Sequence, residues 1–368
     1  MREIRIFIAG LGHVGRAVLA LLQESSSPQV LIAGLADSSG AICFNDALSP
    51  SSGTLSPSSD ALSPSTGPTV LWIAAIAEAK KAGWRLANMD LDGIFGHGQI
   101  TFHRNVEEAI AIARPQVLVE LSSSNTRTGG AAAGHAKAAF AIDADVVFAS
   151  KGALAADWDA IMAAAQDAGR QVRYSATVGG GMPVIDAGTS FAKANPILSI
   201  EAVLNGTSVF VLSMMENGMS LDDAVRSAQQ GGMAETDPSA DLDGLDAAAK
   251  LCILARAVMG CSLEVGKVKR ESLRSVTSAG LSAAIASGRR LRAVATLERD
   301  IHGCIQAGVK LTEVPFESPL ARTGSENAVV FHSRFSGTLS MIGKGAGPME
   351  TAPAVIRDLA VLSESWCT

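Results

Sequence analysis

A run of acidic side chains that ends in a single lysine occupies the stretch AETDPSADLDGLDAAAK, from Ala234 to Lys250. Asp246 and Lys250 are four residues apart where apolar spacing predicts a helix, so both project from one helix face. Because apolar residues follow, we expect a mostly buried helix, with Asp246, Asp243 and Glu235 keeping the lysine charged. Such a lysine can hydrogen-bond a substrate oxygen whose charge changes during a reaction. The alternative is a solvated turn and helix, where the pair would contribute only about 0.3–0.5 kcal/mol.

A second lysine, Lys151, follows directly after the predicted strand ADVVFAS, in the sequence KGAL. Ligands of open α/β sheets bind at the carboxyl ends of the parallel strands. Lys151 is therefore well placed for catalysis and for contact with a bound nucleotide. The alternative interpretation is a solvated loop lysine.

A glycine-rich turn, GLGHVG, joins a predicted buried strand to a predicted helix near the N-terminus. Gly10 permits the tight turn, Gly12 lets the backbone approach a pyrophosphate, and Gly15 lets the helix pack closely on the sheet. His13 and Val14 lie at the start of this helix, whose amide groups would face the phosphates. In this strand-to-helix context the spacing predicts a dinucleotide site, and a glycine turn in an unrelated α/β protein is the alternative.

Asp37 ends the next predicted strand, QVLIAGLAD. An acidic side chain at this place suits the 2′-hydroxyl of an adenosine ribose and repels a 2′-phosphate. No arginine follows it in DSSGAI. We therefore expect NAD as the preferred cofactor, with NADP as the alternative.

A further predicted strand, QVLVEL, leads into a polar loop that contains Ser122, Ser123 and Asn125. In a doubly wound sheet this loop lies at the carboxyl end of its strand, on the ligand-binding edge. We expect these three side chains to lie near the nicotinamide of a bound cofactor.

Two more glycine-rich segments occur in the second half of the chain. The run Gly179–Gly181, followed by Pro183, requires a conformationally special loop. The sequence GKGAG at 343–347, which includes Gly345, precedes a predicted final helix. We expect this loop to close over the bound nucleotide, and a simple loop-to-helix turn is the alternative.

Composition indicates a two-domain globular protein, since 48% of the 368 residues are hydrophobic and 18% are charged. The net charge of −6 disfavours a nucleic-acid surface. The scattered cysteines and histidines indicate neither a disulfide framework nor a transition-metal cluster. No apolar run suits a signal peptide or a membrane span, so we expect a cytoplasmic protein without a membrane partner. Residues 43–68, rich in serine and proline, predict a flexible surface insertion.

The order of these motifs resembles that of the homoserine dehydrogenase family. The shared segments are GLGHVG, KGAL, TVGGGMPVI, NGT, AETDPSADLDGLDAAAKLCILA and GKGAG…TAPAVIRDL. The resemblance implies an α/β fold with a Rossmann-like NAD(P)-binding domain (1–152), a second α/β catalytic and dimerisation domain (153–340), and a C-terminal helix (341–368) that returns to the first domain. It also implies a homodimer that interconverts L-homoserine and L-aspartate 4-semialdehyde with NAD(P), in the short form without an aspartate kinase or ACT domain.

The resemblance implies roles for the two lysines and for several acidic side chains. Lys250 and Asp246 serve hydride and proton transfer, and Lys151 also reaches the reacting site. Glu235 receives the substrate amino group. Further substrate contacts are implied for Asp241, Gly206 and Thr207.

One departure from the family concerns a monovalent cation. Ser175 stands where the family usually has a glutamate, next to a cation-binding loop that Val178 and Gly180 would form here. We therefore expect no metal site, and a sodium loop at Val178 and Gly180, weakened by Ser175, is the alternative.

Other departures lie near the implied substrate contacts. Val209 and Phe210 replace the asparagine and tyrosine of the family's NGTTNY, and Met233 replaces the tyrosine of its GYAE. Because the lysines and acids are kept, we expect homoserine as the substrate. Two alternatives are a dehydrogenase of the same fold for another small hydroxy acid, and a catalytically inactive NAD-binding sensor.

Overall fold

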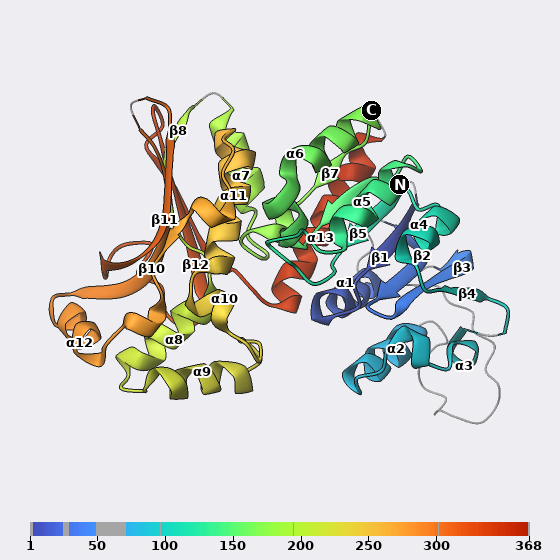
Figure 1. Ribbon diagram of the computed structural model, residues 1–368, viewed down its shortest axis with the longest axis horizontal. Coiled ribbons are helices and arrows are strands. Elements are labelled where there is room, and N and C mark those ends of the chain that lie inside the picture. Colours follow the sequence, from blue (N-terminus) through green and yellow to red (C-terminus); the bar gives the residue numbers. More distant parts are fainter. Residues whose placement is uncertain are drawn as a thin grey trace. The chain divides into compact units, whose positions relative to one another are not determined.

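The computed structural model describes residues 3–24, 29–48, 71–95, 97–193, 195–300 and 302–366. The chain forms two compact units: unit 1 comprises Met1–Tyr174 and Thr351–Thr368, and unit 2 comprises Ser175–Glu350. Each unit has its own β-sheet with helices packed against it (Figure 1), so the predicted α/β class is confirmed. Within the described ranges, no helix combines the length and the apolar character needed to cross a membrane.

The sheet of unit 1 is parallel at its centre, where β2, β1, β5, β6 and β7 are neighbours in that order. At one edge β3 and β4 pair antiparallel. β5 and β6 are buried along their whole length, as expected of parallel strands covered on both faces. The described strands are β1 (Ile4–Ala9), β2 (Val30–Asp37), β3 (Gly40–Leu48), β4 (Ile100–His103), β5 (Val117–Glu120), β6 (Asp145–Phe148) and β7 (Val172–Arg173).

The helices of unit 1 begin and end at recognisable signals. Asn105 caps α4 by accepting a hydrogen bond from the Glu108 amide, and Arg114 ends it in the left-handed conformation. In α6, Asp157 has non-helical angles of φ −142° and ψ 42°, so the first turns form a separate short segment. The described helices are α1 (His13–Glu24), α2 (Leu71–Lys81), α3 (Leu91–Phe95), α4 (Val106–Ala113), α5 (Ala132–Phe140), α6 (Lys151–Asp167), α13 (Pro348–Ser365) and the 3₁₀ turn η2 (Leu86–Asn88).

The predicted Ser/Pro-rich insertion is wrong at its start. Residues 43–48 belong to β3, which pairs with β2 on one side and β4 on the other. The apolar run AICF of this strand is buried in the sheet, and the predicted boundary lies too early because serine and proline dominate only beyond this strand. Residues 49–68 of the predicted insertion lie outside the described residues.

Helix α13, red in Figure 1, completes unit 1 from the far end of the chain. The Arg173 guanidinium pairs with Asp358 at 3.3 Å, and the Asp358 carboxylate is fully buried. The Trp366 indole N–H donates to Asp145 Oδ2 at 2.9 Å. These contacts fasten α13 to the strand ends at β6 and β7.

The sheet of unit 2 has the order β13-β12-β8-β10-β11-β9 and is antiparallel except for the β11–β9 pair. Its strands are β8 (Ile197–Val203), β9 (Lys269–Arg270), β10 (Arg289–Arg299), β11 (Ile305–Pro315), β12 (Glu326–Ser333) and β13 (Thr338–Lys344). The described helices are α7 (Val184–Ala192), α8 (Gly206–Glu216), α9 (Leu221–Gln230), α10 (Ser239–Leu242), α11 (Leu245–Met259) and α12 (Ser278–Ala286), with 3₁₀ turns η3 (Ser175–Thr177), η4 (Val265–Lys267) and η5 (Leu273–Ser275).

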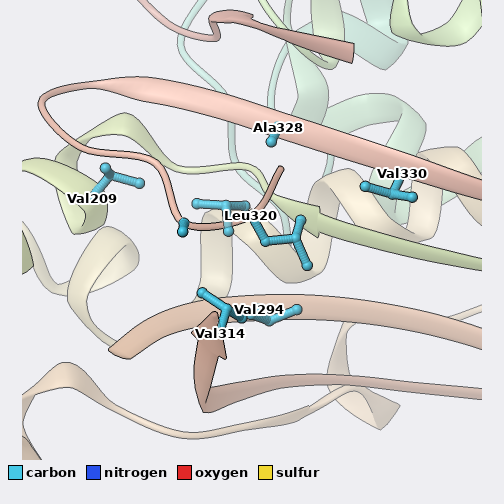
Figure 2. Close-up of a cluster of buried hydrophobic side chains, with 8 residues drawn as sticks. Val209, Val294, Val314, Leu320, Ala328 and Val330 are labelled. Atoms are coloured by element: carbon cyan, nitrogen blue, oxygen red, sulfur yellow. The ribbon is translucent and has the colours of Figure 1, made fainter. Parts of the chain in front are cut away.

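The two faces of this sheet bury different sets of side chains. Phe331 projects toward α7, where its ring would lie 2.9 Å from a Cβ added to Gly188. The opposite face holds a cluster of buried aliphatic side chains from β8, β10, β11, β12, α8 and the loop before β12 (Figure 2). Its members are Val203, Val209, Val294, Val314, Leu320, Ala321, Ala328 and Val330.

Candidate active site

The glycine turn of unit 1 has the close packing that its sequence predicts. Gly10 has φ +119°, and a Cβ there would lie 2.5 Å from the Leu121 carbonyl. A Cβ at Gly15 would lie 2.0 Å from the Gly10 oxygen, whereas a Cβ at Gly12 would meet nothing within 4 Å. The turn therefore requires glycine at two of these positions and leaves open space beside Gly12. His13 begins α1, whose N-terminal amides are a favourable place for phosphate groups.

The carboxylate of Asp37, at the end of β2, is bound on both oxygens. Oδ1 accepts from the Ser39 amide at 2.8 Å and from the Ser39 hydroxyl at 2.6 Å. Oδ2 accepts from Lys80 Nζ at 2.7 Å and from the Leu86 amide at 2.9 Å. Burial raises the pKa of Asp37, but these hydrogen bonds lower the pKa more, so it lies below its usual value of 3.8. The segment TVLWIAAIAEAKKAGW predicts a helix with lysines near its end, but nothing in the sequence pairs Lys80 with Asp37.

The loop after β5 lies directly against the glycine turn. The Ser122 amide donates to Glu120 Oε1 at 2.8 Å, and that amide nitrogen is 2.7 Å from the Cβ position of Gly10. The Ser122 hydroxyl is buried and has no hydrogen-bond partner among the residues that the structure describes. Together with the open space at Gly12, this buried donor fits a bound dinucleotide, which NAD(P) would supply.

The same loop meets the start of α6. Asn125 Oδ1 accepts from the Arg127 and Thr128 amides, which stabilises the loop turn. The Lys151 amide donates to Ser124 Oγ at 2.9 Å, and a Cβ at Gly152 would lie 2.5 Å from the Asn125 nitrogen. The structure therefore brings Lys151 next to the loop that contains Ser122, Ser123 and Asn125.

A buried histidine, His135, pairs with Glu120 at the end of β5, directly before this loop. His135 Nδ1 lies 2.6 Å from Glu120 Oε2, and both side chains are almost completely buried. Burial lowers the pKa of His135, but the hydrogen bond and charge of Glu120, with the charge of Glu107, raise it above its usual value of 6.5. Neither Glu120 nor His135 was identified from the sequence, because their pairing joins a strand end to the middle of a helix.

In unit 2, Lys250 is held at the end of β8. Its side chain is 6% exposed, and Nζ lies 2.7 Å from Asp246 Oδ2. Nζ also donates to the Leu204 carbonyl at 2.6 Å. The predicted one-turn spacing of Asp246 and Lys250 is confirmed, and the pair is a buried ion pair rather than a solvated one.

Asn205 links the acidic side chains of this site. Its amide nitrogen donates to Asp241 Oδ1 at 2.6 Å and to Asp246 Oδ2 at 3.0 Å. Its oxygen accepts from the Ser208 amide at 2.7 Å, so Asn205 is also the N-cap of α8. The sequence indicates a turn at Asn205-Gly206, but nothing in it shows that Asn205 connects Asp241 with Asp246.

Two acids that we expected beside Lys250 have other surroundings. Asp243 Oδ1 instead accepts from Ser272 Oγ at 2.6 Å and faces Arg274 Nε at 3.3 Å. Glu235 is exposed, and its carboxylate makes no hydrogen bond or ion pair with the described part of the chain. The expectation failed for Asp243 because α10 and Gly244, with φ +70°, turn the chain before α11 begins.

The start of α8 carries the other two implied substrate contacts. Gly206 follows the cap, and a Cβ there would lie 3.0 Å from the Ser325 carbonyl. The Thr207 hydroxyl donates to the Met233 carbonyl at 2.9 Å, which ties α8 to the loop that contains Glu235. Gly206 and Thr207 therefore lie at the same end of β8 as Lys250.

The positions that depart from the family have different environments. Val209 is 1% exposed and belongs to the aliphatic cluster shown in Figure 2. Phe210 is half-buried, and Met233 is 37% exposed beside the Thr207 contact. Val209 therefore contributes to packing, whereas Met233 lies on the surface near the candidate site.

The loop suggested for a cation, at Val178 and Gly180, packs closely against Gly345. The Ser175 hydroxyl donates to Asp186 Oδ2 at 2.8 Å. Val178 is fully buried, and a Cβ at Gly180 would lie 2.9 Å from the Gly345 carbonyl carbon. Across the described residues, no group of three or more His, Cys, Asp or Glu side chains could hold a metal ion.

The thiol near Lys250 is not suited to nucleophilic chemistry. Cys252 follows Lys250 by two residues on α11 and is 1% exposed. Burial raises the pKa of its thiol to about 12. The protonated thiol is therefore a packing group at neutral pH.

Known families match both units. A family model described as homoserine dehydrogenase matches residues 183–360, and one described as its NAD binding domain matches residues 95–175. Homoserine dehydrogenase of Methanocaldococcus jannaschii is 36% identical over 66% of this chain and 71% of its own. An NAD(+)-dependent homoserine dehydrogenase of Pseudomonas canavaninivorans is 31% identical over 70% of this chain and 74% of its own.

Solved structures show the same similarity over the whole fold. A homoserine dehydrogenase from Thiobacillus denitrificans has a TM-score of 0.75 at 26% identity and covers 100% of this chain and 74% of its own. A hyperthermophilic archaeal homoserine dehydrogenase in complex with NADPH has a TM-score of 0.76 at 27% identity and covers 98% of each chain. With the glycine turn in unit 1 and the buried lysine–acid site in unit 2, these matches show that the chain belongs to the homoserine dehydrogenase family, the NAD(P)-dependent oxidoreductases that interconvert L-homoserine and L-aspartate 4-semialdehyde.

Proposed function

We propose that Lys250 and Asp246 form the reacting centre for the homoserine hydroxyl. The observation that carries this proposal is the desolvated Lys250 ammonium, held by Asp246 at 2.7 Å and by the Leu204 carbonyl at 2.6 Å. A fixed positive charge in a water-poor site stabilises an oxygen that becomes negative when its proton leaves. When homoserine is oxidised, bound NAD(P) would accept the hydride, and a water molecule held by a lysine would accept the hydroxyl proton. Lys250 therefore hydrogen-bonds the substrate hydroxyl oxygen and stabilises its alkoxide character in both directions of the reaction.

Asn205 and the acids around it position this centre. Asn205 holds Asp246 and Asp241 in one network, which fixes the direction from which Asp246 pairs with Lys250. We assign substrate contacts to Asp241, and to Gly206 and Thr207 at the start of α8. Glu235, whose carboxylate is exposed, receives the substrate ammonium group.

Lys151 and the polar loop of unit 1 serve the cofactor side of the reaction. We assign contacts with the nucleotide to Ser122, Ser123, Asn125 and Lys151, since the loop and the start of α6 are in direct contact. Gly10, Gly12 and Gly15, with His13 and Val14, form the pyrophosphate turn. Gly345 contributes from the GKGAG loop.

For the cofactor we propose a preference for NAD over NADP. The Asp37 carboxylate at the end of β2 repels a 2′-phosphate, and its lowered pKa keeps it charged. Lys80 offsets part of this repulsion because it pairs directly with Asp37 at 2.7 Å. NADP is therefore disfavoured rather than excluded.

The assembly proposal is a homodimer in which unit 2 provides both the reacting centre and the dimer contacts. It rests on membership in the family. Size-exclusion chromatography with light scattering measures it, and a mass of one chain at micromolar concentration would contradict it.

The test of the proposed chemistry is a substrate panel with NAD and NADP, run on the wild type and on Lys250→Ala. We expect reduction of the cofactor with homoserine, and a turnover at least about 10²-fold lower in Lys250→Ala while the protein remains folded. Near-normal turnover in that variant would contradict the role of Lys250. Activity on another small hydroxy acid with none on homoserine would contradict the substrate.

A further inference from the structure

Asn327, on β12, is a fully buried amide without a partner. Its side chain is 0% exposed, and neither Nδ2 nor Oδ1 has a hydrogen-bond partner among the residues that the structure describes. Burying an amide in this state destabilises the folded protein, because the group loses its hydrogen bonds to water. A leucine has nearly the same branched shape and would fill the position without this cost. Packing alone therefore does not account for an asparagine here.

The position of Asn327 connects it with the candidate active site. Ala328, the next residue of β12, pairs with Val203 of β8. Leu204 follows Val203 and Asn327 precedes Ala328, so both residues lie at the same end of this antiparallel strand pair. Leu204 is the residue whose carbonyl binds the Lys250 ammonium.

Asn327 projects from the face of the unit 2 sheet that α11, the helix of Lys250, also covers. Side chains alternate along a strand, so Asn327 projects from the same face as Phe331. Phe331 packs against α7 near Gly188, where Val258 of α11 also approaches. Lys250 belongs to α11 as well, so Asn327 and Lys250 approach the end of β8 from the same face.

On its other side the amide touches the GKGAG loop. A Cβ at Gly345 would lie 1.8 Å from Asn327 Nδ2, so only glycine allows this contact. Gly345 in turn is in close contact with Gly180. The unpaired amide thus lies between the residue that holds Lys250 and a glycine loop of the same unit.

We propose that Asn327 is a substrate-binding residue, whose amide hydrogen-bonds a polar group of the small amino-acid substrate that Lys250 holds. This proposal rests on the proposed role of Lys250. An amide offers two N–H donors and one oxygen acceptor, which suits a substrate that carries a hydroxyl, a carboxylate and an ammonium group. The free protein carries the cost of the buried amide, and the bound substrate removes it.

The experiment replaces the amide by an apolar group of the same shape, Asn327→Leu, with Asn327→Ala as a second variant. Asn195→Leu is the matched control. Asn195 is also buried in unit 2, and its Nδ2 also has no partner among the described residues, but its oxygen accepts from the Phe335 amide at 2.9 Å. Thermal unfolding is measured without ligands, and KM for homoserine and for NAD are measured separately. Wild type and Lys250→Ala are assayed alongside.

We expect Asn327→Leu to unfold at the wild-type temperature or above it in the absence of ligands. We expect its KM for homoserine to rise about tenfold, the loss of one buried hydrogen bond, with an unchanged KM for NAD. Asn195→Leu should show the reverse pattern, a lower unfolding temperature and an unchanged KM for homoserine.

Three results would overturn the assignment: a lower unfolding temperature of Asn327→Leu with an unchanged KM for homoserine, an increase in the KM for NAD alone, and failure of both Asn327 variants to fold. A failure of the proposed function has a different signature. If Lys250→Ala keeps normal turnover while Asn327→Leu raises the KM for homoserine, the role of Lys250 is wrong and that of Asn327 stands.

Discussion

Replacing Asp246 by asparagine removes one charge from the candidate active site and almost nothing else. The amide keeps the shape of the carboxylate and an oxygen that can accept from Lys250. What it removes is the counter-charge of an ammonium whose side chain is 6% exposed, next to a carboxylate that is 15% exposed. The variant therefore separates the electrostatic role of Asp246 from its packing.

The expected loss of stability follows from the burial of the pair. Breaking a buried ion pair costs about 3–5 kcal/mol, because the remaining charge is left uncompensated. Lys250 keeps the Leu204 carbonyl at 2.6 Å and the new amide oxygen, so the lower end of about 3 kcal/mol applies. We also expect turnover with homoserine to fall at least about tenfold, since the ammonium loses the group that orients it.

Urea unfolding followed by far-UV circular dichroism measures the stability, and steady-state kinetics measure the turnover. The matched control is Asp237→Asn, an exposed acid of the same stretch whose carboxylate accepts hydrogen bonds from Ser239. We expect this substitution to leave both the stability and the turnover almost unchanged. The buried ion pair does not exist as described if the free energy of unfolding of Asp246→Asn lies within about 0.5 kcal/mol of the wild-type value and its turnover is normal.

Two other predictions concern unit 1. Asp37→Ala should lower the ratio of the KM for NADP to the KM for NAD, because the substitution frees Lys80 to face a 2′-phosphate. Lys80→Met should raise this ratio. The same ratio in both variants would refute the proposed preference. The raised pKa of His135 means that protonated His135 is favoured in the folded state. The stabilisation of the folded state by protonated His135 is complete at pH values below its usual pKa of about 6.5. This stabilisation is lost as the pH rises through the pKa of His135 in the folded protein. The free energy of unfolding should thus decrease over that range in the wild type and less in His135→Gln, and identical slopes would contradict the buried pair with Glu120.

Local signals in the sequence predicted several elements correctly. The sequence SLDDAVRSAQQGG predicts a helix with Ser220 as its N-cap and Gly231 near its end. In the structure Ser220 begins α9 by accepting a hydrogen bond from the Asp223 amide, and Gly231 ends the helix. The spacing of Asp246 and Lys250 placed both on one face of α11 for the same reason. In each case the interacting groups are separated by about one helical turn, so the pattern contains the geometry.

Contacts between distant parts of the chain could not be predicted in this way. Asp37 pairs with Lys80, which is 43 residues away in the sequence, and Asn205 hydrogen-bonds Asp241, which is 36 residues away. Nothing in the neighbouring residues specifies such partners, since they depend on how the strands are ordered. The same holds for Asp243. Its place in the acidic stretch predicted that it would lie beside Lys250, but in the structure it accepts a hydrogen bond from Ser272.

Unit 1 is discontinuous, and this affects the order in which the protein can fold during synthesis. Its first segment is complete at Tyr174, but its last helix belongs to 351–368, so the contiguous unit 2 emerges in between. At about 5–20 residues per second, the ribosome needs roughly 10–40 s to add the remaining residues. During this time Arg173 and Asp145 lack their partners Asp358 and Trp366. The unit that is synthesised first is therefore the last to be completed, and substitutions in α13 should reduce the yield of folded protein more than equivalent substitutions in unit 2.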